Sequence, residues 1–178
     1  VILEENSTAT LWDLATGKKL FDLAGHTQPL YNAAFSLDGK RLVTVGKDGN
    51  AIVWDVQTGK RLLLILTGHS SSINVAVFSR DETRLATGGY DGAVKVWDVS
   101  AGSTTGRELL NLTGYSPFIF TVEFSPDGRY LTSSSFSDGT TRVYALRIED
   151  LIAIAHSRLT RAFTLEECKK YLHQAVCP

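Results

Sequence analysis

The end of one short segment recurs four times along the chain, and this repetition constrains the fold more than any other feature of the sequence. Three copies close on a Trp-Asp pair, at Trp12-Asp13, Trp54-Asp55 and Trp97-Asp98, and a fourth has Tyr144 at the same place. The copies lie about 43 residues apart, a spacing typical of repeat architectures. We therefore expect an array of similar units, with any function located on the surface of the array.

Each unit shows the same order of residues before its Trp-Asp end. In the second unit these are Gly25-His26, then Leu30, Phe35, a turn at residues 36–39 and Asp48-Gly49. Alternating apolar positions between such turns predict short antiparallel strands, four in each unit. Glycine after aspartate supplies the positive φ that a tight turn needs.

This combination of offsets resembles the WD-repeat β-propeller family, over residues 1 to about 146. The resemblance implies an all-β fold, a partial propeller of about three and a half four-stranded blades with a short C-terminal α-helical extension. Because one blade cannot bury both of its faces, neighbouring blades must stack. The expected divisions are an incomplete first blade at 1–24, blades at 25–67 and 68–113, a degenerate last blade at 114–147 and a helical tail at 148–178.

The start of the chain falls inside a repeat. Aligned on Trp12, residues 2–7 correspond to residues 44–49, so Val1 lies in the second strand of a blade. This alignment indicates the C-terminal part of a longer propeller. Propellers need about four to eight blades to close, so we expect exposed apolar blade faces and a possible homodimer that pairs them.

Two sets of polar and aromatic side chains recur at matching positions, and they could suggest a hydroxyl-histidine-aspartate relay of the kind that hydrolases use. The sets are His26, Thr44, Asp48 and Trp54, and His69, Thr87, Asp91 and Trp97. The family resemblance implies instead a structural hydrogen-bond network, since a buried indole N–H and imidazole need partners. Repetition in successive blades also argues against a single catalytic centre, so we expect no catalytic residues.

The terminal blades depart from this pattern. In the first blade Asn6 stands at the aspartate position and Ile2 at the hydroxyl position. In the last blade Tyr115 replaces the histidine and Tyr144 replaces the tryptophan. Only the two middle blades are therefore expected to hold complete networks.

The resemblance also implies a partner-binding face, formed by the loops that lead into the first strand of each blade and those that join the second strand to the third. These positions are Tyr31, Asn74 and Phe120 in the first kind of loop, Lys47, Tyr90 and Ser137 in the second, with Tyr115, Pro117, Phe118 and Phe136 nearby in the last blade. Large rigid aromatic side chains give contact area at low entropic cost, which favours a binding hot spot. The alternative is that Phe118 and Phe120 cap the terminal blade or face the tail.

After Tyr144 the apolar period changes from two to about 3.6. This period predicts a helix that begins near Asp150, whose carboxylate caps the free amides, and a second helix with Thr164 and Glu167 as a capping box. The tail resembles an extension that follows propellers in large bacterial multidomain proteins with an ATPase, kinase or protease-like effector upstream. The resemblance implies that the chain is the sensing or docking end of such a signalling protein.

Both cysteines lie in the tail, in the order Cys168, His173 and Cys177. On one helix these side chains point in divergent directions, which disfavours a zinc site. A disulfide needs a chain reversal after the helix, because nine helical residues span roughly 13 Å. Free thiols and a disulfide both stay open, and we expect no metal and no cofactor.

Charge and hydropathy limit the remaining classes of function. The chain has 18 basic and 19 acidic residues, and this balance argues against nucleic acid as a partner. It has no apolar run long enough for a membrane span and no targeting signal, which favours a cytoplasmic setting. We expect a non-catalytic protein-protein interaction scaffold or sensor module. The alternatives are an architectural oligomerisation module and an enzyme with a propeller-borne site.

Overall fold

The computed structural model describes residues 1–4, 7–66, 68–100, 106–114 and 117–158 of the 178-residue chain. The chain divides into two compact units, Val1–Tyr144 and Ala145–Pro178. In the described part of the chain, no helix has the length and apolarity that a membrane crossing requires.

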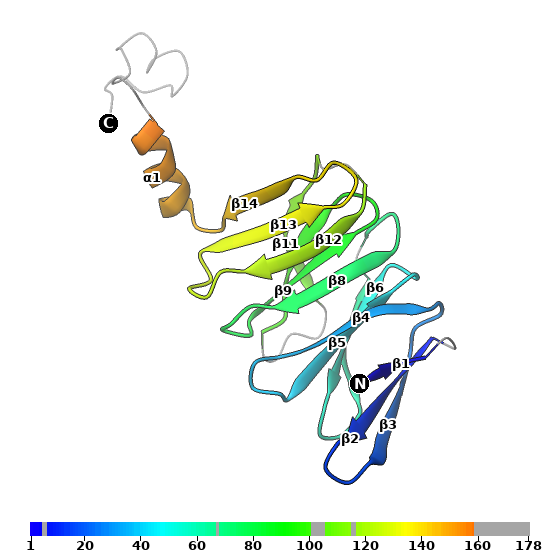
Figure 1. The fold of residues 1–178 in the computed structure, drawn as a ribbon. Helices are drawn as coiled ribbons and strands as arrows, with labels where there is room; N and C mark the ends of the chain where they lie inside the picture. Colours follow the sequence, from blue (N-terminus) through cyan, green and yellow to red (C-terminus); the bar gives the residue numbers. More distant parts are fainter. Residues whose placement is uncertain (5–6, 67, 101–105, 115–116, 159–178) are drawn as a thin grey trace. The chain divides into compact units, whose positions relative to one another are not determined.

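The first unit consists of four antiparallel sheets that follow one another along the sequence (Figure 1). The first sheet has the strands β1 (Ile2–Leu3), β2 (Thr8–Asp13) and β3 (Lys18–Ala24). The second has β4 (Leu30–Phe35), β5 (Arg41–Gly46), β6 (Asn50–Asp55) and β7 (Arg61–Leu66). The third has β8 (Ile73–Phe78), β9 (Arg84–Gly89), β10 (Val94–Asp98) and β11 (Arg107–Leu112), and the fourth has β12 (Ile119–Phe124), β13 (Tyr130–Ser135) and β14 (Thr141–Ala145). These sheets and one short helix confirm the expected fold class, a partial propeller.

The strand register makes the sheets directly comparable. Ile2 on β1 pairs with Thr10 on β2 in the same way that Thr44 on β5 pairs with Ile52 on β6. The strand β1 therefore takes the place of the second strand of a blade, as the alignment on Trp12 predicts.

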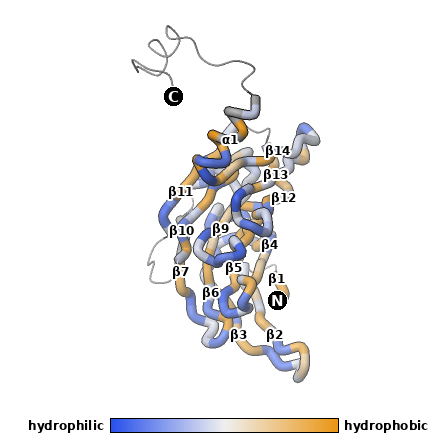
Figure 2. The backbone as a smooth tube through the Cα atoms, turned by 90° about the vertical axis from the view of Figure 1, so that its left-hand side faces the viewer, coloured by the Kyte–Doolittle hydropathy of each residue, from blue (hydrophilic) through white to orange (hydrophobic). Residues whose placement is uncertain are grey.

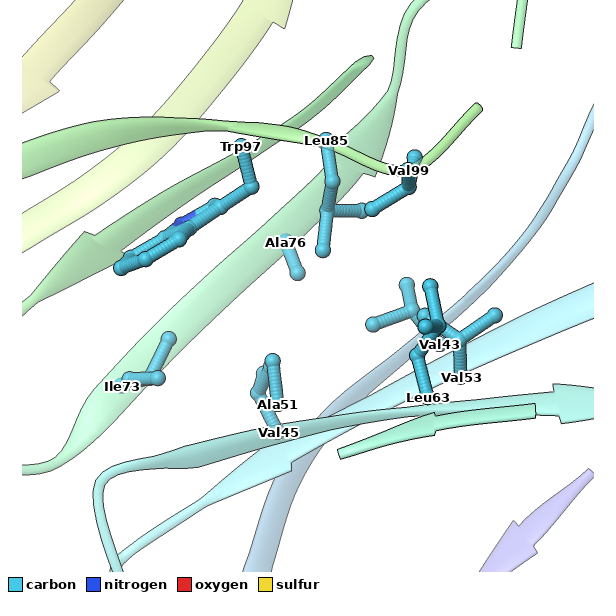
Figure 3. Packing of buried hydrophobic residues seen from close by; sticks show 10 residues of the cluster. All are labelled: Val43, Val45, Ala51, Val53, Leu63, Ile73, Ala76, Leu85, Trp97 and Val99. Atoms are coloured by element: carbon cyan, nitrogen blue, oxygen red, sulfur yellow. The ribbon is translucent and has the colours of Figure 1, made fainter. Parts of the chain in front are cut away.

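Apolar side chains from neighbouring sheets pack against each other. Figure 3 shows Val43, Val45 and Val53 of the second sheet facing Leu85 and Trp97 of the third. A second cluster joins the first sheet to the other face of the second sheet, through Ala9, Leu23, Leu30, Leu42, Ile52 and Trp54. Burial of each Val or Leu side chain contributes about 1.5–3 kcal/mol, so these contacts are the main source of cohesion in the array.

The turn between the first and second strands has the same serine-aspartate hydrogen bond in the second, third and fourth sheets. The Ser36 hydroxyl donates to Asp38 at 2.7 Å and accepts from the backbone N–H of Arg41 at 2.9 Å. Ser79 and Asp81, and Ser125 and Asp127, form the same pair. Such polar turns alternate with the hydrophobic strand segments along the chain (Figure 2).

The described part of the second unit, residues 145–158, contains the helix α1 (Ile148–Arg158). It begins two residues before the expected start, so Asp150 lies in its first turn and is not the capping residue. A carboxylate there still favours the positive end of the helix dipole. Two residues of the predicted apolar face, Leu151 and Ile152, are each 51% exposed. The predicted second helix lies outside the described residues.

Candidate functional site

Four side chains of the second sheet form one hydrogen-bonded set. The Nδ1 atom of His26 lies 2.9 Å from Oδ2 of Asp48, and its Nε2 lies 2.9 Å from the Thr44 hydroxyl. The indole of Trp54 donates to the same hydroxyl at 2.8 Å. Asp48 also accepts from the backbone N–H groups of Thr27 and Asn50, each at 3.0 Å. The set links the loop before β4 to β5, β6 and the turn between them.

The third sheet repeats this arrangement. His69 lies 3.0 Å from both Asp91 and Thr87, and the Trp97 indole donates to Thr87 at 3.0 Å. The Asp91 carboxylate also accepts from the backbone N–H of Ser70 at 2.9 Å. The eight residues singled out in the sequence thus come together in two separate groups of four.

The protonation of the third-sheet set follows from its surroundings. Burial lowers the pKa of His69 below its ordinary value, against the opposing influence of the Asp91 carboxylate. Burial alone would raise the pKa of Asp91, but its hydrogen bonds, first that from His69, outweigh burial and lower this pKa. A neutral imidazole then donates from Nδ1 to Asp91 and accepts the Thr87 hydroxyl proton at Nε2.

The second-sheet carboxylate has a similar environment. Burial would raise the pKa of Asp48, yet hydrogen bonds from the amides of Thr27 and Asn50 and from His26 lower it. Thr44 is completely buried and His26 is 8% exposed. A hydroxyl already shared between an indole and an imidazole, and closed off from solvent, is poorly placed for attack on a substrate.

The terminal sheets differ from this pattern in the residues that they carry at the four positions. Thr10 occupies the position of Ile52, and its buried hydroxyl bonds to Glu4 at 2.5 Å. Asn6 and Tyr115 lie outside the described residues. In the fourth sheet Asp138 accepts from the backbone and side chain of Thr140, at 3.0 and 2.7 Å.

The aromatic residues predicted for the partner-binding face form a continuous row, which we call the aromatic ridge: Tyr31, Tyr90, Phe118, Phe120 and Phe136. The ring centroids of Tyr31 and Tyr90 are 6.1 Å apart, and those of Tyr90 and Phe118 are 4.4 Å apart. Phe118 contacts Phe136 at 5.6 Å and Phe120 at 6.4 Å. The ridge therefore joins residues of the second, third and fourth sheets.

Most of the ridge is open to solvent. Phe136 is 74% exposed, Phe120 is 56% exposed, and Tyr31 and Tyr90 are each about 40% exposed. Phe118 has a φ of +76°, an uncommon value for a bulky residue. Its backbone N–H donates to Tyr90 at 3.3 Å and its carbonyl accepts from Phe136 at 3.0 Å. These bonds hold the strained residue at the centre of the ridge.

Two polar residues predicted for this face already have partners within the fold. The Asn74 amide donates to the carbonyl of Ile119 at 3.2 Å, which joins the third sheet to the fourth. The Ser137 hydroxyl donates to the carbonyl of Pro117 at 2.5 Å. Both side chains therefore have a hydrogen-bond partner within the fold, whereas Lys47 is exposed, and the role of all three in partner binding stays a prediction.

Sequence reasoning missed a second set of contacts between the sheets. The Arg41 guanidinium donates to the carbonyls of Val99 at 2.7 Å and Glu82 at 2.6 Å, and it lies 5.1 Å from the centre of the Phe78 ring. Arg84 occupies the same register position and donates to the carbonyl of Gly128 at 3.2 Å. The recurrence of arginine immediately before Leu42 and Leu85 was the signal that could have revealed these contacts.

No group of three or more His, Cys, Asp or Glu side chains in the described ranges is arranged to hold a metal ion. Cys168, His173 and Cys177 all lie outside those ranges.

Comparison with known proteins identifies the family to which the chain belongs. The family model of the WD domain, G-beta repeat, matches residues 17–55, 60–98 and 106–145, more than half of the chain. Each matched segment begins at or just before the outer strand of one sheet and ends with the third strand of the next. The chain belongs to the WD-repeat family.

Curated relatives match over single stretches. Coronin-7 of Mus musculus is 44% identical over 48 residues, which cover 27% of this chain and 5% of that protein. Autophagy-related protein 16 of Arabidopsis thaliana is 40% identical over 27% of this chain and 9% of its own length. DDB1- and CUL4-associated factor 10 of Xenopus tropicalis is 40% identical over 29% of this chain and 11% of its own length. The chain thus matches only a small part of each of these longer relatives.

Proposed function

We propose that the chain is a non-catalytic protein-interaction module and that its partner binds on the aromatic ridge. The observation that carries this proposal is the contact of five aromatic side chains drawn from three sheets, four of them exposed and Phe118 half-buried. WD repeats generally serve protein-protein interaction, and one relative is named for its association with two other proteins.

The physical case rests on exposure and rigidity. Isolated exposed apolar residues are common, but a contiguous row of them is unusual on a monomer and marks an interaction surface. The rings of the ridge hold one another in place, so binding immobilises few side-chain rotamers. The partner best suited to it is a protein segment with apolar side chains that fill the spaces between Tyr31, Tyr90 and Phe120.

The experiment uses peptides selected on the full chain and measures their affinity for variants by calorimetry. Replacing Tyr31, Tyr90 and Phe120 with alanine together is expected to weaken binding at least 30-fold, about 2 kcal/mol. Phe35→Ala is the matched control, because Phe35 is 48% exposed and belongs to no ridge contact described above. Unchanged affinity in the triple variant, with an unchanged melting temperature, would refute the ridge as the binding surface.

We infer that the two His-Thr-Asp-Trp sets perform no turnover and serve to fix the strands of their sheets. Their burial and their duplication support this role. A hydrolytic activity of the purified chain that disappears in Thr87→Val, while the fold survives, would contradict it.

An architectural oligomerisation role is the second candidate, and a specific observation favours it. Ile2 is 53% exposed and Trp12 is 38% exposed on the face of the first sheet that points away from the second. A homodimer could cover these side chains. Sedimentation of the wild type and of Trp12→Ser at micromolar concentration tests this candidate, which predicts dissociation of the variant and fails if the wild type is already monomeric.

The proposal extends to the context of the chain. The helical tail and the repeat pattern support a place at the docking end of a longer, cytoplasmic bacterial signalling protein, without nucleic acid or membrane as partner. The five proposed divisions of the chain, with boundaries after residues 24, 67, 113 and 147, follow the same pattern.

A further inference from the structure

We propose that the partner of the aromatic ridge is an extended, proline-rich segment with an acidic residue next to its prolines, and that Lys47 binds this carboxylate. The inference rests on the proposed function, because it takes the ridge as the binding surface, and it adds the chemical class of the partner. Three observations support it: the kind of side chain that forms the ridge, the two tyrosine hydroxyls within it, and the charge beside it.

The side chains of the ridge are all aromatic rings, with contacting centroids between 4.4 and 6.4 Å apart. Proline-rich segments in the polyproline II conformation dock on aromatic side chains. An amphipathic helix instead lays its apolar face into a hydrophobic groove. Phe120 and Phe136 are 56% and 74% exposed, so these rings stand out from the surface and do not line a groove. The ridge therefore suits a proline-rich segment better than a helix.

Two rings of the ridge carry hydroxyl groups. Tyr31 and Tyr90 are 41% and 40% exposed, and neither hydroxyl forms a hydrogen bond within the residues that the structure describes. A polyproline II segment has no internal hydrogen bonds, so all its carbonyl groups can accept from such donors. In a helix, only the carbonyls of the last turn lack an internal partner. The two hydroxyls thus favour an extended partner.

Lys47 lies next to the tyrosine end of the ridge. Its backbone N–H donates to the carbonyl of Pro29, two residues before Tyr31, at 2.8 Å. Its carbonyl accepts from the Ser72 hydroxyl at 3.5 Å. The carbonyl of Ser72 in turn accepts from the backbone N–H of Tyr90 at 2.9 Å. These bonds hold Lys47 beside the segments that carry both tyrosines.

The charge at this end of the ridge is positive. Lys47 is exposed and forms no ion pair with any residue of the described ranges. The side chains of Asp48 and Asp91 are only 3% and 9% exposed, because each carboxylate bonds to a buried histidine. Asp138 is exposed, but it lies at the other end of the ridge, after Phe136, and accepts from Thr140.

An exposed cation beside an apolar surface favours a partner with a carboxylate at the matching place. Such complementary charges speed the encounter and fix the register of binding. The carboxylate of the partner then binds at Lys47, and its prolines pack on the rings from Tyr31 towards Phe136.

Synthetic peptides and the full chain test this inference. One peptide has nine consecutive prolines with two aspartates at each end, and a second has lysines in place of the aspartates. In calorimetry at about 50 mM salt, we expect the aspartate peptide to bind the wild type at least about 10-fold more tightly. This preference should shrink at about 0.5 M salt. Equal affinities of the two peptides at low salt would overturn the proposal.

Charge reversal at Lys47 tests the contact itself. Lys47→Glu is expected to bind the lysine peptide more tightly than the aspartate peptide. Lys60→Glu is the matched control, because Lys60 is exposed and lies between β6 and β7, at the opposite end of the second sheet. The control should keep the preference of the wild type. A reversal in both variants would indicate an effect of overall charge and would refute the assignment to Lys47.

Tyr31→Phe and Tyr90→Phe together remove the hydroxyls and keep the rings. We expect this double variant to bind the aspartate peptide at least about 5-fold more weakly, with an unchanged melting temperature. An alanine-rich helical peptide with the same acidic ends should bind the wild type at least about 10-fold more weakly than the proline peptide. Unchanged affinity in the double variant, or tighter binding of the helical peptide, would contradict an extended partner.

The results also separate this inference from the proposed function. The proline peptides fail as partners if neither binds the wild type with a Kd below about 1 mM. If selected peptides nevertheless lose affinity when Tyr31, Tyr90 and Phe120 are replaced with alanine, the ridge remains the binding surface and only the class of partner is wrong. If no peptide depends on these three rings, both proposals fall.

Discussion

The indole of Trp97 and the imidazole of His69 meet at one atom, the Thr87 hydroxyl oxygen, at 3.0 Å each. Thr87 itself is completely buried. One hydroxyl therefore satisfies two buried polar groups, and its removal leaves both without that partner.

Thr87→Val keeps the shape of the side chain and removes the shared hydroxyl. We expect a loss of about 1–3 kcal/mol in the free energy of unfolding, since the Trp97 N–H and the His69 Nε2 are left unpaired. Urea denaturation followed by tryptophan fluorescence measures this loss. Thr132→Val is the control on a half-buried face, with an expected change below about 0.5 kcal/mol. Equal losses in the two variants would contradict the role given to Thr87.

Asp91→Ala tests the carboxylate of the same set. Asp91 accepts hydrogen bonds from His69 and from the amides of Ser70 and Ala93, so its removal is expected to cost about 1–3 kcal/mol. Asp138→Ala is the comparison within the chain, because Asp138 is exposed and accepts from Thr140. Thermal unfolding of both variants should show the larger loss for Asp91→Ala, and an unchanged melting temperature in that variant would rule out the prediction.

The stability of the fold should decrease on acidification in two stages. The folded pKa of His69 is depressed, so below about 6.5 the unfolded chain binds a proton that the folded chain refuses. The folded pKa values of Asp48 and Asp91 are depressed as well, so a further loss begins below about 3.9.

Melting temperatures between pH 7.5 and pH 5 isolate the histidine stage. Lys95 and Glu108, which form an ion pair at 2.7 Å, also act on His69. His69→Gln should reduce the slope of melting temperature against pH. A slope identical to that of the wild type would assign the pH dependence to other groups.

Arg41→Met tests the contact between the second and third sheets. The substitution keeps an apolar stem of similar length and removes the donors to the Val99 and Glu82 carbonyls. We expect a loss of about 1–3 kcal/mol, because hydrogen bonds from a charged group are stronger than neutral ones. Arg80→Met, at an exposed position, is the control. Similar unfolding midpoints for the two variants would show that the Arg41 contact contributes little.

Repetition made the middle sheets predictable. Thr44 and Thr87, and likewise Trp54 and Trp97, occupy one register position in consecutive units, so their shared environment could be inferred before any coordinates. The chain could also be assigned the correct fold class, because turn chemistry and strand alternation agree with each other along its length.

Contacts between sheets were harder to predict. The sequence predicted a loop position for both Asn74 and Ser137, but Asn74 lies in β8. The bonds of these residues to Ile119 and Pro117 depend on how neighbouring segments approach each other. Arginine is usually a surface residue, so its type alone does not place Arg41 between sheets. Its hydrogen bonds go to carbonyl groups 41 and 58 residues further along the chain. Local pattern carries little information about such pairs.

The terminal regions show a different limit. Thr132 and Ser134 are ordinary strand residues in sequence, and only the strand register shows that they occupy the positions of Val43 and Val45 in the second sheet. The helix α1 begins at Ile148, so Glu149 and Asp150 both lie in its first turn, whereas the sequence indicated Asp150 as the capping residue.

Gly88 has no side chain, and this distinguishes the third repeat from the second at the surface that meets the next sheet. Ile119 and Val122 fill the space that a Cβ at this position would need, whereas Val45 occupies the same register position one repeat earlier. Exchanging the second and third repeats would bring an isopropyl group against Ile119 and leave a void where Val45 had packed. At this position the second and third repeats are therefore not interchangeable, because each is shaped for the sheet that follows it.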